Sequence, residues 1–338
     1  MSLGSSSFDS PWSRLAAIWT GVAVVSVASV VVAPLAAFVL MISAFGLPHV
    51  LYELRYVDER FSARTSAPAL GLIGALVGLI ALARIANSTH VLSAEAFVPL
   101  ELGLGAALAF AAAAFMRENR LLGALIGAAF ALGATYAPVA TFLIWAWAHN
   151  LTPMGFVAEI TQGEERRRWL AALSLPFFVL PALVATGVFH EAAALVFPIG
   201  ETERLSAFGA GDKPLASFLA PGVSDLHLFS AAVVAQAMHY VAVIVLMPML
   251  LRAKQAGIRP ATIAPWPSWR MFALGVAVVA AIAFCIYAVS YTDARAGYAV
   301  AAAIHAWIEL PVLLLALGQG FVPPVSSLGA ARAQAPQD

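Results

Sequence analysis

The chain has 338 residues, of which 62% are hydrophobic and 11% are charged, and its mean hydropathy is +0.89. Soluble domains carry about 25% charged residues, so this composition indicates an integral membrane protein and excludes an ordinary soluble domain. The 18 basic and 18 acidic residues cancel formally, which argues against a nucleic-acid-binding surface and leaves no nucleic-acid partner to expect.

Ten segments are long and apolar enough to cross a bilayer as helices, which takes about 20 predominantly apolar residues. In chain order they are residues 13–33, 35–57, 67–86, 96–116, 120–136, 138–159, 168–189, 225–251, 269–291 and 297–319. The first segment lacks a basic region before it and a small-residue cleavage site after it. We therefore expect a retained span rather than a signal peptide.

Two pairs of predicted spans are separated only by a proline, at Ala33-Pro34 and at Ala137-Pro138. Proline has no backbone N–H and disfavours helix at the residue before it, so each site is either a hairpin between spans or a kink within one helix. The two joined runs, of about 45 and 40 residues, are far too long for one crossing. We therefore predict hairpins.

The loop charges predict the orientation. With a cytoplasmic N-terminus, fourteen of the eighteen Lys and Arg residues fall inside, as the positive-inside rule requires. We thus predict an all-α, polytopic transmembrane helical bundle of about 10 spans in a bacterial inner membrane, with both termini cytoplasmic. Residues 1–321 form one bundle domain with an external loop or cap at 190–224, and residues 322–338 form a disordered tail. The basic residues predicted outside are Arg84, Arg204, Lys213 and Arg295.

This topology places the seven histidines of the chain in two groups, one in or beside loops and one within spans. His90, His190 and His227 lie in or beside external loops, where we expect ordinary surface residues. The other four lie within predicted spans that run in the same direction. They are about 8 to 14 residues from the external ends, which confines them to a slab roughly 9 Å thick. These four histidines are His49, His149, His239 and His305.

A lone histidine in a membrane helix is usually a neutral ring bonded across a helix interface. Four histidines at the same depth predict a metal site instead. The single cysteine, Cys285, excludes Cys-x-x-Cys ligands, so His, Asp or Glu would hold any metal.

Two of these histidines have a carboxylate four residues later, at Glu53 and Glu309. This spacing stacks each His and Glu on one helix face. Such a carboxylate can ligate the metal or accept the imidazole N–H and so orient the ring. Because an ionisable group in a bilayer costs roughly 2.5 kcal/mol or more, we predict catalytic roles for both acids. Further polar neighbours that could hydrogen-bond to the site are Asn150, Gln236 and Tyr240.

Other polar and aromatic groups allow two interpretations. Glu101 is predicted as an unpaired intramembrane carboxylate, either a proton relay or ligand, or a protonated acid bonded to a neighbouring helix. The polar string at residues 53–60 predicts an ion-paired helix end with Tyr and Arg at the headgroups. Trp145, Trp147 and Trp307 line a substrate cavity or simply pack.

The string Gly46-Leu47-Pro48-His49 on the second span, with single histidines on later spans, resembles the Brp/Blh family of membrane carotenoid oxygenases. The resemblance implies one non-haem iron held by four membrane histidines and cleavage of β-carotene to retinal. It matches His49 to the family's first ligand and the other three histidines by order alone. Val50 and Glu53 stand where the family has Gly and Asp.

We therefore expect a membrane-embedded, metal-dependent oxygenase or oxidoreductase that uses Fe(II) and acts on a lipid-soluble substrate such as an isoprenoid or acyl lipid. Zinc and copper suit the same ligands. One alternative is a haem b or quinone electron-transfer subunit with axial histidine pairs. Another is a proton-coupled transporter or a structural subunit of a membrane complex. The chain has no convincing internal repeat, which weighs against the transporter.

Overall fold

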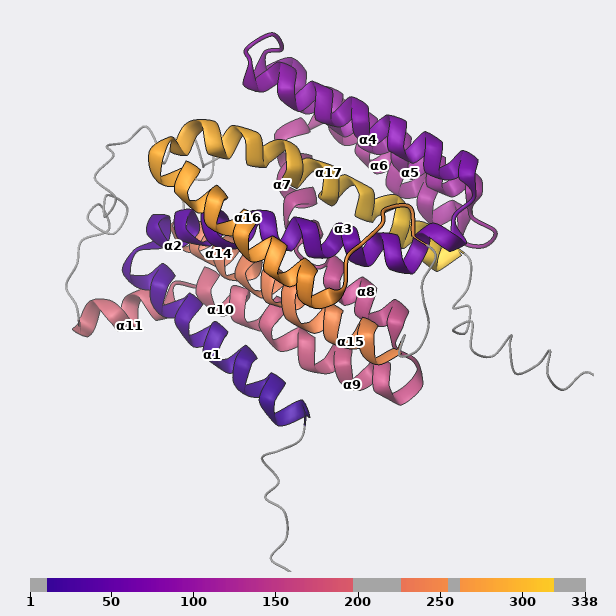
Figure 1. Cartoon of the computed structure of the whole chain (residues 1–338). Coiled ribbons are helices and arrows are strands. Elements are labelled where there is room, and N and C mark those ends of the chain that lie inside the picture. The colour runs from indigo at the N-terminus through magenta and orange to yellow at the C-terminus, as the bar shows by residue number, and fades with distance from the viewer. Residues whose placement is uncertain (1–10, 197–225, 255–261, 319–338) are drawn as a thin grey trace, which may run out of the picture.

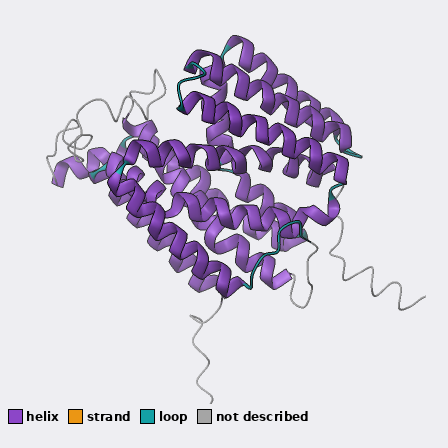
Figure 2. Ribbon diagram, turned by 45° about the horizontal axis from the view of Figure 1, so that its top comes forward, coloured by secondary structure: helices purple, strands orange, loops and turns teal. Residues whose placement is uncertain are grey.

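The computed structural model describes residues 11–196, 226–254 and 262–318, and the regular structure in these ranges is entirely helical (Figure 2). The helices are α1 (Pro11–Val32), α2 (Pro34–Met41), α3 (Leu47–Phe61), α4 (Ala67–Ser88), α5 (Ala94–Phe115), α6 (Arg120–Tyr136), α7 (Pro138–His149), α8 (Thr152–Ile160), α9 (Gly163–Ser174), α10 (Leu180–Ala185), α11 (Val188–Val196), α14 (Leu226–Val241), α15 (Met247–Lys254), α16 (Trp269–Val289) and α17 (Tyr291–Gly318). The predicted all-α class is confirmed.

Within the described ranges, seven continuous helices are long and apolar enough to cross a membrane. They are Pro34–Arg64, Ala67–Ser88, Ala94–Phe115, Gly163–Ala185, Leu226–Lys254, Trp269–Val289 and Tyr291–Gly318. The apolar helices at Ala17–Val32 and Arg120–Tyr136 are shorter. The chain is therefore a helical membrane protein. Of the predicted cap, α11 covers the first residues, whereas 197–225 and the predicted tail lie outside the described residues.

The prediction of one helix over residues 138–159 is wrong, because α7 ends at His149 and α8 begins at Thr152. Pro153 has no N–H to donate to the carbonyl of His149, four residues earlier. The hydroxyl of Thr152 donates to that same carbonyl at 2.7 Å. The helix therefore breaks directly after His149, which is one of the predicted ligands.

The helix breaks predicted at the two prolines are confirmed. Ala33 and Ala137 are both non-helical, with φ near −150°, and α2 and α7 begin at the prolines that follow them. α1 and α2 meet at a sharp turn (Figure 1). At the second break, a Cβ on Gly133 would overlap the side chain of Thr141. The close approach of these two residues shows that α6 and α7 fold back on each other as a hairpin.

Three π-helical segments widen the long helices of the described chain: η2 (Ile42–Gly46), η4 (Leu175–Val179) and η5 (Ala242–Leu246). Each is followed two residues later by a proline, at Pro48, Pro181 and Pro248 respectively. A proline ring inside a helix clashes with the carbonyl four residues earlier, and a local widening relieves that clash. Such widenings are frequent at functional sites, and η2 and η5 flank His49 and His239 along their helices.

Three apolar clusters surround the centre of the bundle. The first is built mainly from α3, α8, α9, α14, η5 and α15, the second from α4, α5, α7 and α17, and the third from α1, α2, α10 and α14. In Figure 1, α3, α17 and α14 pass through the middle of the molecule. The side chains that meet between the clusters come from α3, α7, α14 and α17, and they are the predicted ligands.

The polar string at residues 53–60 forms ion pairs, as predicted. Arg55 Nε lies 2.7 Å from Glu59 Oε1, and Arg60 makes two hydrogen bonds to Glu159, at 2.7 and 2.8 Å. The expected position of Tyr56 at the headgroups is wrong. Its side chain is buried against the ring of Phe156, because α8 packs over this face of α3.

We expect Gly105→Ala to lower the stability of the bundle by about 1–3 kcal/mol, because a Cβ there would overlap the ring of Trp307 in a packed core. The matched control is Gly103→Ala on the same helix, where a Cβ meets no atom within 4 Å. Thermal unfolding in detergent, followed by circular dichroism, measures both. Equal melting temperatures for the two variants would contradict the packing of α17 on α5.

Candidate metal centre

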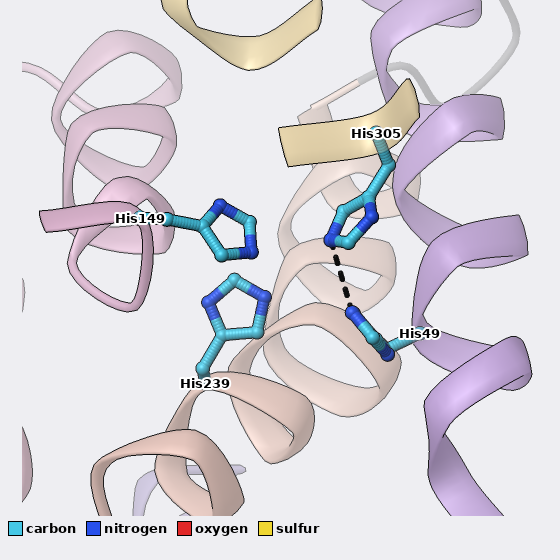
Figure 3. Close-up of side chains that lie close together, drawn as sticks. All are labelled: His49, His149, His239 and His305. Atoms are coloured by element: carbon cyan, nitrogen blue, oxygen red, sulfur yellow. Dashed lines mark hydrogen bonds between the residues drawn. The ribbon is translucent and has the colours of Figure 1, made fainter. Parts of the chain in front are cut away.

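The four membrane histidines, distant in sequence, come together in space (Figure 3). Their ring nitrogens, one from each residue, all lie within 4.8 Å of one another. The side chains of His239 and His305 are 1% and 2% exposed, and that of His149 is 14% exposed. The structure thus assembles a histidine cluster that could hold a metal ion, at the residues predicted from the sequence.

Backbone carbonyls orient two of these rings. His49 Nδ1 lies 3.2 Å from the carbonyl oxygen of Phe45, and His305 Nδ1 lies 3.4 Å from that of Ala301. A carbonyl oxygen only accepts, so Nδ1 donates in both rings. In a neutral imidazole, the other nitrogen, Nε2, then carries a lone pair. Both rings therefore have the form that ligates a metal through Nε2.

These two Nε2 atoms face each other at 3.0 Å. Two lone pairs at this separation repel unless a proton or a cation lies between them. Metal–nitrogen bonds are about 2.1 Å long, so two nitrogens 3.0 Å apart fit adjacent positions on one ion, at an angle of about 90°. The geometry of His49 and His305 is therefore compatible with shared coordination.

His149 and His239 form a second pair, with ring centroids 4.7 Å apart. His149 Nδ1 lies 2.8 Å from Glu309 Oε2, so the carboxylate accepts from the ring and orients it. His239 Nε2 is 3.7 Å from Glu53 Oε2 and has no hydrogen-bond partner in the described part of the chain. This nitrogen is also free to ligate.

The two predicted catalytic acids complete the cluster. Glu53 and Glu309 are fully buried with their carboxyl groups next to each other; when both are ionised, neither oxygen of Glu53 nor Oε1 of Glu309 has a hydrogen-bond partner among the described residues. Leaving a buried carboxylate unpaired is costly, because its charge loses hydration without compensation. One oxygen of each lies within 4.8 Å of the other and of nitrogens from His239 and His305. This second set of donors is also suited to a cation.

A tyrosine pair lies beside His49. The ring of Tyr240 stacks on that of His49, with centroids 4.1 Å apart and an interplanar angle of 25°. Its hydroxyl is 2.9 Å from that of Tyr298 and accepts from Gln236 Nε2 at 2.7 Å. Sequence reasoning missed Tyr298, although its position two helical turns before His305 places both on one face of α17.

Of the other residues predicted to lie near the histidines, some do and some do not. The side chain of Asn150 donates to the carbonyl of Ala146, not to an imidazole. Trp145 and Trp307 stack, with centroids 4.9 Å apart, and pack beside the histidines. Trp147 is 39% exposed on the outer surface of the bundle, so it does not line an internal cavity with them.

The prediction that Glu101 is unpaired is wrong. Glu101 Oε1 accepts from Arg84 Nη2 at 2.7 Å and from Trp307 Nε1 at 2.6 Å. The sequence could not show this pairing, because it joins α5 to α4 and α17. Its charge is compensated, so Glu101 is a structural acid that holds Trp307 against the site.

The three other histidines lie away from the cluster. His90 is exposed with φ of 60°, as expected for a loop. His190 is 3% exposed, which corrects its assignment to the surface. Its Nδ1 lies 3.3 Å from His227 Nδ1, and its Nε2 lies 3.3 Å from Ser230 Oγ.

Comparison with known proteins does not identify the chain: no protein-family model, curated protein or solved structure matches it. The resemblance to the Brp/Blh family therefore stays a prediction, and the site has to be interpreted from its own geometry.

We expect Glu53→Leu to raise the melting temperature of chelator-treated protein, and Glu101→Leu to lower it. Replacing a buried carboxylate that has no hydrogen-bond partner by an apolar group removes a desolvation cost of about 1–3 kcal/mol. Removing one partner of a buried pair costs about 3–5 kcal/mol, because Arg84 would lose its counter-charge. Thermal unfolding with excess chelator measures both. A similar loss in the two variants would mean that Glu53 is also a structural acid.

Proposed function

We propose that this protein is a membrane-embedded, metal-dependent oxygenase or oxidoreductase that binds Fe(II) at His49, His149, His239 and His305 and acts on a lipid-soluble substrate. The observation that carries the proposal is the convergence of four imidazoles, three of them buried, with two fully buried carboxyl groups inside an apolar bundle. Ionisable groups at membrane depth are costly and mark functional sites. About ten spans, both termini in the cytoplasm and a bacterial inner membrane belong to the same proposal.

The chemistry of the donors favours iron. Imidazole nitrogens with carboxylate oxygens and open positions suit non-haem Fe(II), while thiolates, which favour softer ions, do not take part. The single cysteine, Cys285, is exposed on the outer face of α16. When bound, Fe(II) would supply the activation of dioxygen toward the substrate. Zinc and copper share these ligands and are distinguished by metal analysis.

The residues of the chain would have distinct roles. The carbonyls of Phe45 and Ala301 hold two rings with Nε2 toward the centre, and Glu309 orients His149. Glu53 Oε2, 3.7 and 3.9 Å from nitrogens of His239 and His305, is placed to hold or accept a proton beside the metal. The apolar helices around them keep bulk water away from the reacting groups.

Access from the lipid fits the position of His149. Its side chain is 14% exposed, whereas the other rings of the cluster are almost fully buried. It lies at the break between α7 and α8, and the neighbouring Trp147 faces outward. We propose that an isoprenoid or acyl chain reaches the metal from the bilayer at this break. Carotenoids are the first substrates to test, on the strength of the motif resemblance.

A haem b site with His49 and His305 as its axial ligands is disfavoured by distance. Axial nitrogens on opposite sides of one iron are about 4 Å apart, since each metal–nitrogen bond is about 2 Å. His49 Nε2 and His305 Nε2 are only 3.0 Å apart, and the other two rings occupy the space beside them. A transporter or a structural subunit would instead purify without stoichiometric metal.

We expect detergent-purified protein to contain iron without a Soret band, and alanine in place of any of His49, His149, His239 or His305 to lower bound iron at least tenfold. Elemental analysis with an absorption spectrum measures both, and gel filtration confirms that each variant is folded. The matched control is His90→Ala, an exposed histidine outside the cluster. Full iron content in all four variants would refute the assignment.

Activity is tested by supplying dioxygen and candidate lipids to the iron-loaded protein and analysing the products by mass spectrometry. Products containing oxygen from labelled dioxygen would support the oxygenase. Bound iron with no consumption of dioxygen on any isoprenoid or acyl lipid would contradict it.

A further inference from the structure

The four histidines of the cluster lie as two neighbouring pairs in Figure 3. His49 and His305 form one pair, with Nε2 atoms 3.0 Å apart. His149 and His239 form the other, with ring centroids 4.7 Å apart, and the ring of His149 is nearly as close to that of His305, at 4.8 Å. Each pair comes from two different helices, so neither follows from local spacing.

Each carboxylate lies near a nitrogen of both pairs, within 4.8 Å. Glu53 Oε2 lies 3.7 Å from His239 Nε2 and 3.9 Å from His305 Nε2, one nitrogen from each pair. Glu309 lies 2.8 Å from His149 through Oε2, and one of its oxygens is within 4.8 Å of donor atoms of His305 and Glu53. The carboxylates are thus positioned between the two imidazole pairs.

We propose that the cluster holds two metal ions side by side, one on each imidazole pair, bridged by the carboxylates of Glu53 and Glu309. This inference rests on the proposed metal-dependent function. Ions in two-metal sites lie about 3.5–4 Å apart. Helical bundles build such sites from Glu and His side chains that project inward from facing helices. Here α3 and α17 each supply His-x-x-x-Glu, and α7 and α14 each supply one histidine.

A single ion on the four imidazoles leaves both carboxylates unused as ligands. His49 and His305 use Nδ1 for backbone carbonyls, so each has one nitrogen left and ligates one ion. One ion held by the four imidazoles would leave both oxygens of Glu53 and Oε1 of Glu309 with only a proton shared between the two acids. A second ion between the carboxylates satisfies these oxygens. Hydroxide derived from water would offset its added charge.

The number of bound ions tests the proposal directly. Metal-free protein is loaded anaerobically with Fe(II) or, separately, Mn(II), and gel-filtered, and the metal per chain is measured by elemental analysis. We expect about two ions per chain, as in other two-metal sites. Mn(II) bound as a pair should show spin coupling by electron paramagnetic resonance, which an isolated ion does not.

The outcomes separate the two proposals. One ion per chain with an uncoupled Mn(II) spectrum would overturn the paired site and leave the metal-dependent function standing. No bound metal would overturn both. Two uncoupled ions would place the second ion away from the cluster and would also overturn the pairing.

Variants test the bridging role. Glu53→Gln and Glu309→Gln should each abolish the spin coupling and lower the second ion's affinity at least tenfold. Glu101→Gln is the matched control, because Glu101 is an equally buried acid outside the cluster whose partners, Arg84 and Trp307, can still donate to the amide oxygen. Coupling that survives in both test variants would refute bridging by these carboxylates.

Discussion

The site depends on one constraint: two imidazole rings, buried in an apolar bundle, direct their lone pairs at each other across 3.0 Å. Each ring is fixed by a carbonyl of its own helix, at Phe45 and Ala301, so neither can turn away without losing a hydrogen bond. In a medium with little water to screen the repulsion, this arrangement requires a proton or a cation between the nitrogens. The packing of α3 against α17 therefore brings together two rings that could hold a cation.

The parts of the fold that the sequence predicted are those that depend on neighbouring residues. Apolar length marked the long helices, and the prolines at 34 and 138 marked two breaks, because proline acts on the residues just before it. The break after His149 was missed, although Pro153 lies four residues later. Pro48 and Pro248, which also lack an N–H, only widen their helices. Whether a proline ends, kinks or widens a helix thus depends on the helices packed around it.

In the site, too, features within one helix could be predicted from the sequence, whereas contacts between helices could not. The His-x-x-x-Glu spacings of α3 and α17 could be recognised in the sequence because they lie within one helix. The contact between His149 and Glu309 joins residues 160 positions apart, and that between Arg84 and Glu101 joins two helices. Neither leaves a pattern in a single sequence. The histidines could be predicted to share a depth, but which of them face each other is decided by tertiary packing.

The buried acids differ in whether a neighbouring group balances the charge of the carboxylate. Glu101 has a guanidinium and an indole N–H on one oxygen, so its charge is balanced by the fold itself. Glu53 and Glu309 are equally buried, but their neighbours are imidazoles and each other, and no Lys or Arg contacts them in the described residues. A stable bundle could have avoided the cost of these two carboxylates by using apolar residues of similar volume. Their presence next to four imidazoles is what the proposed metal site would explain.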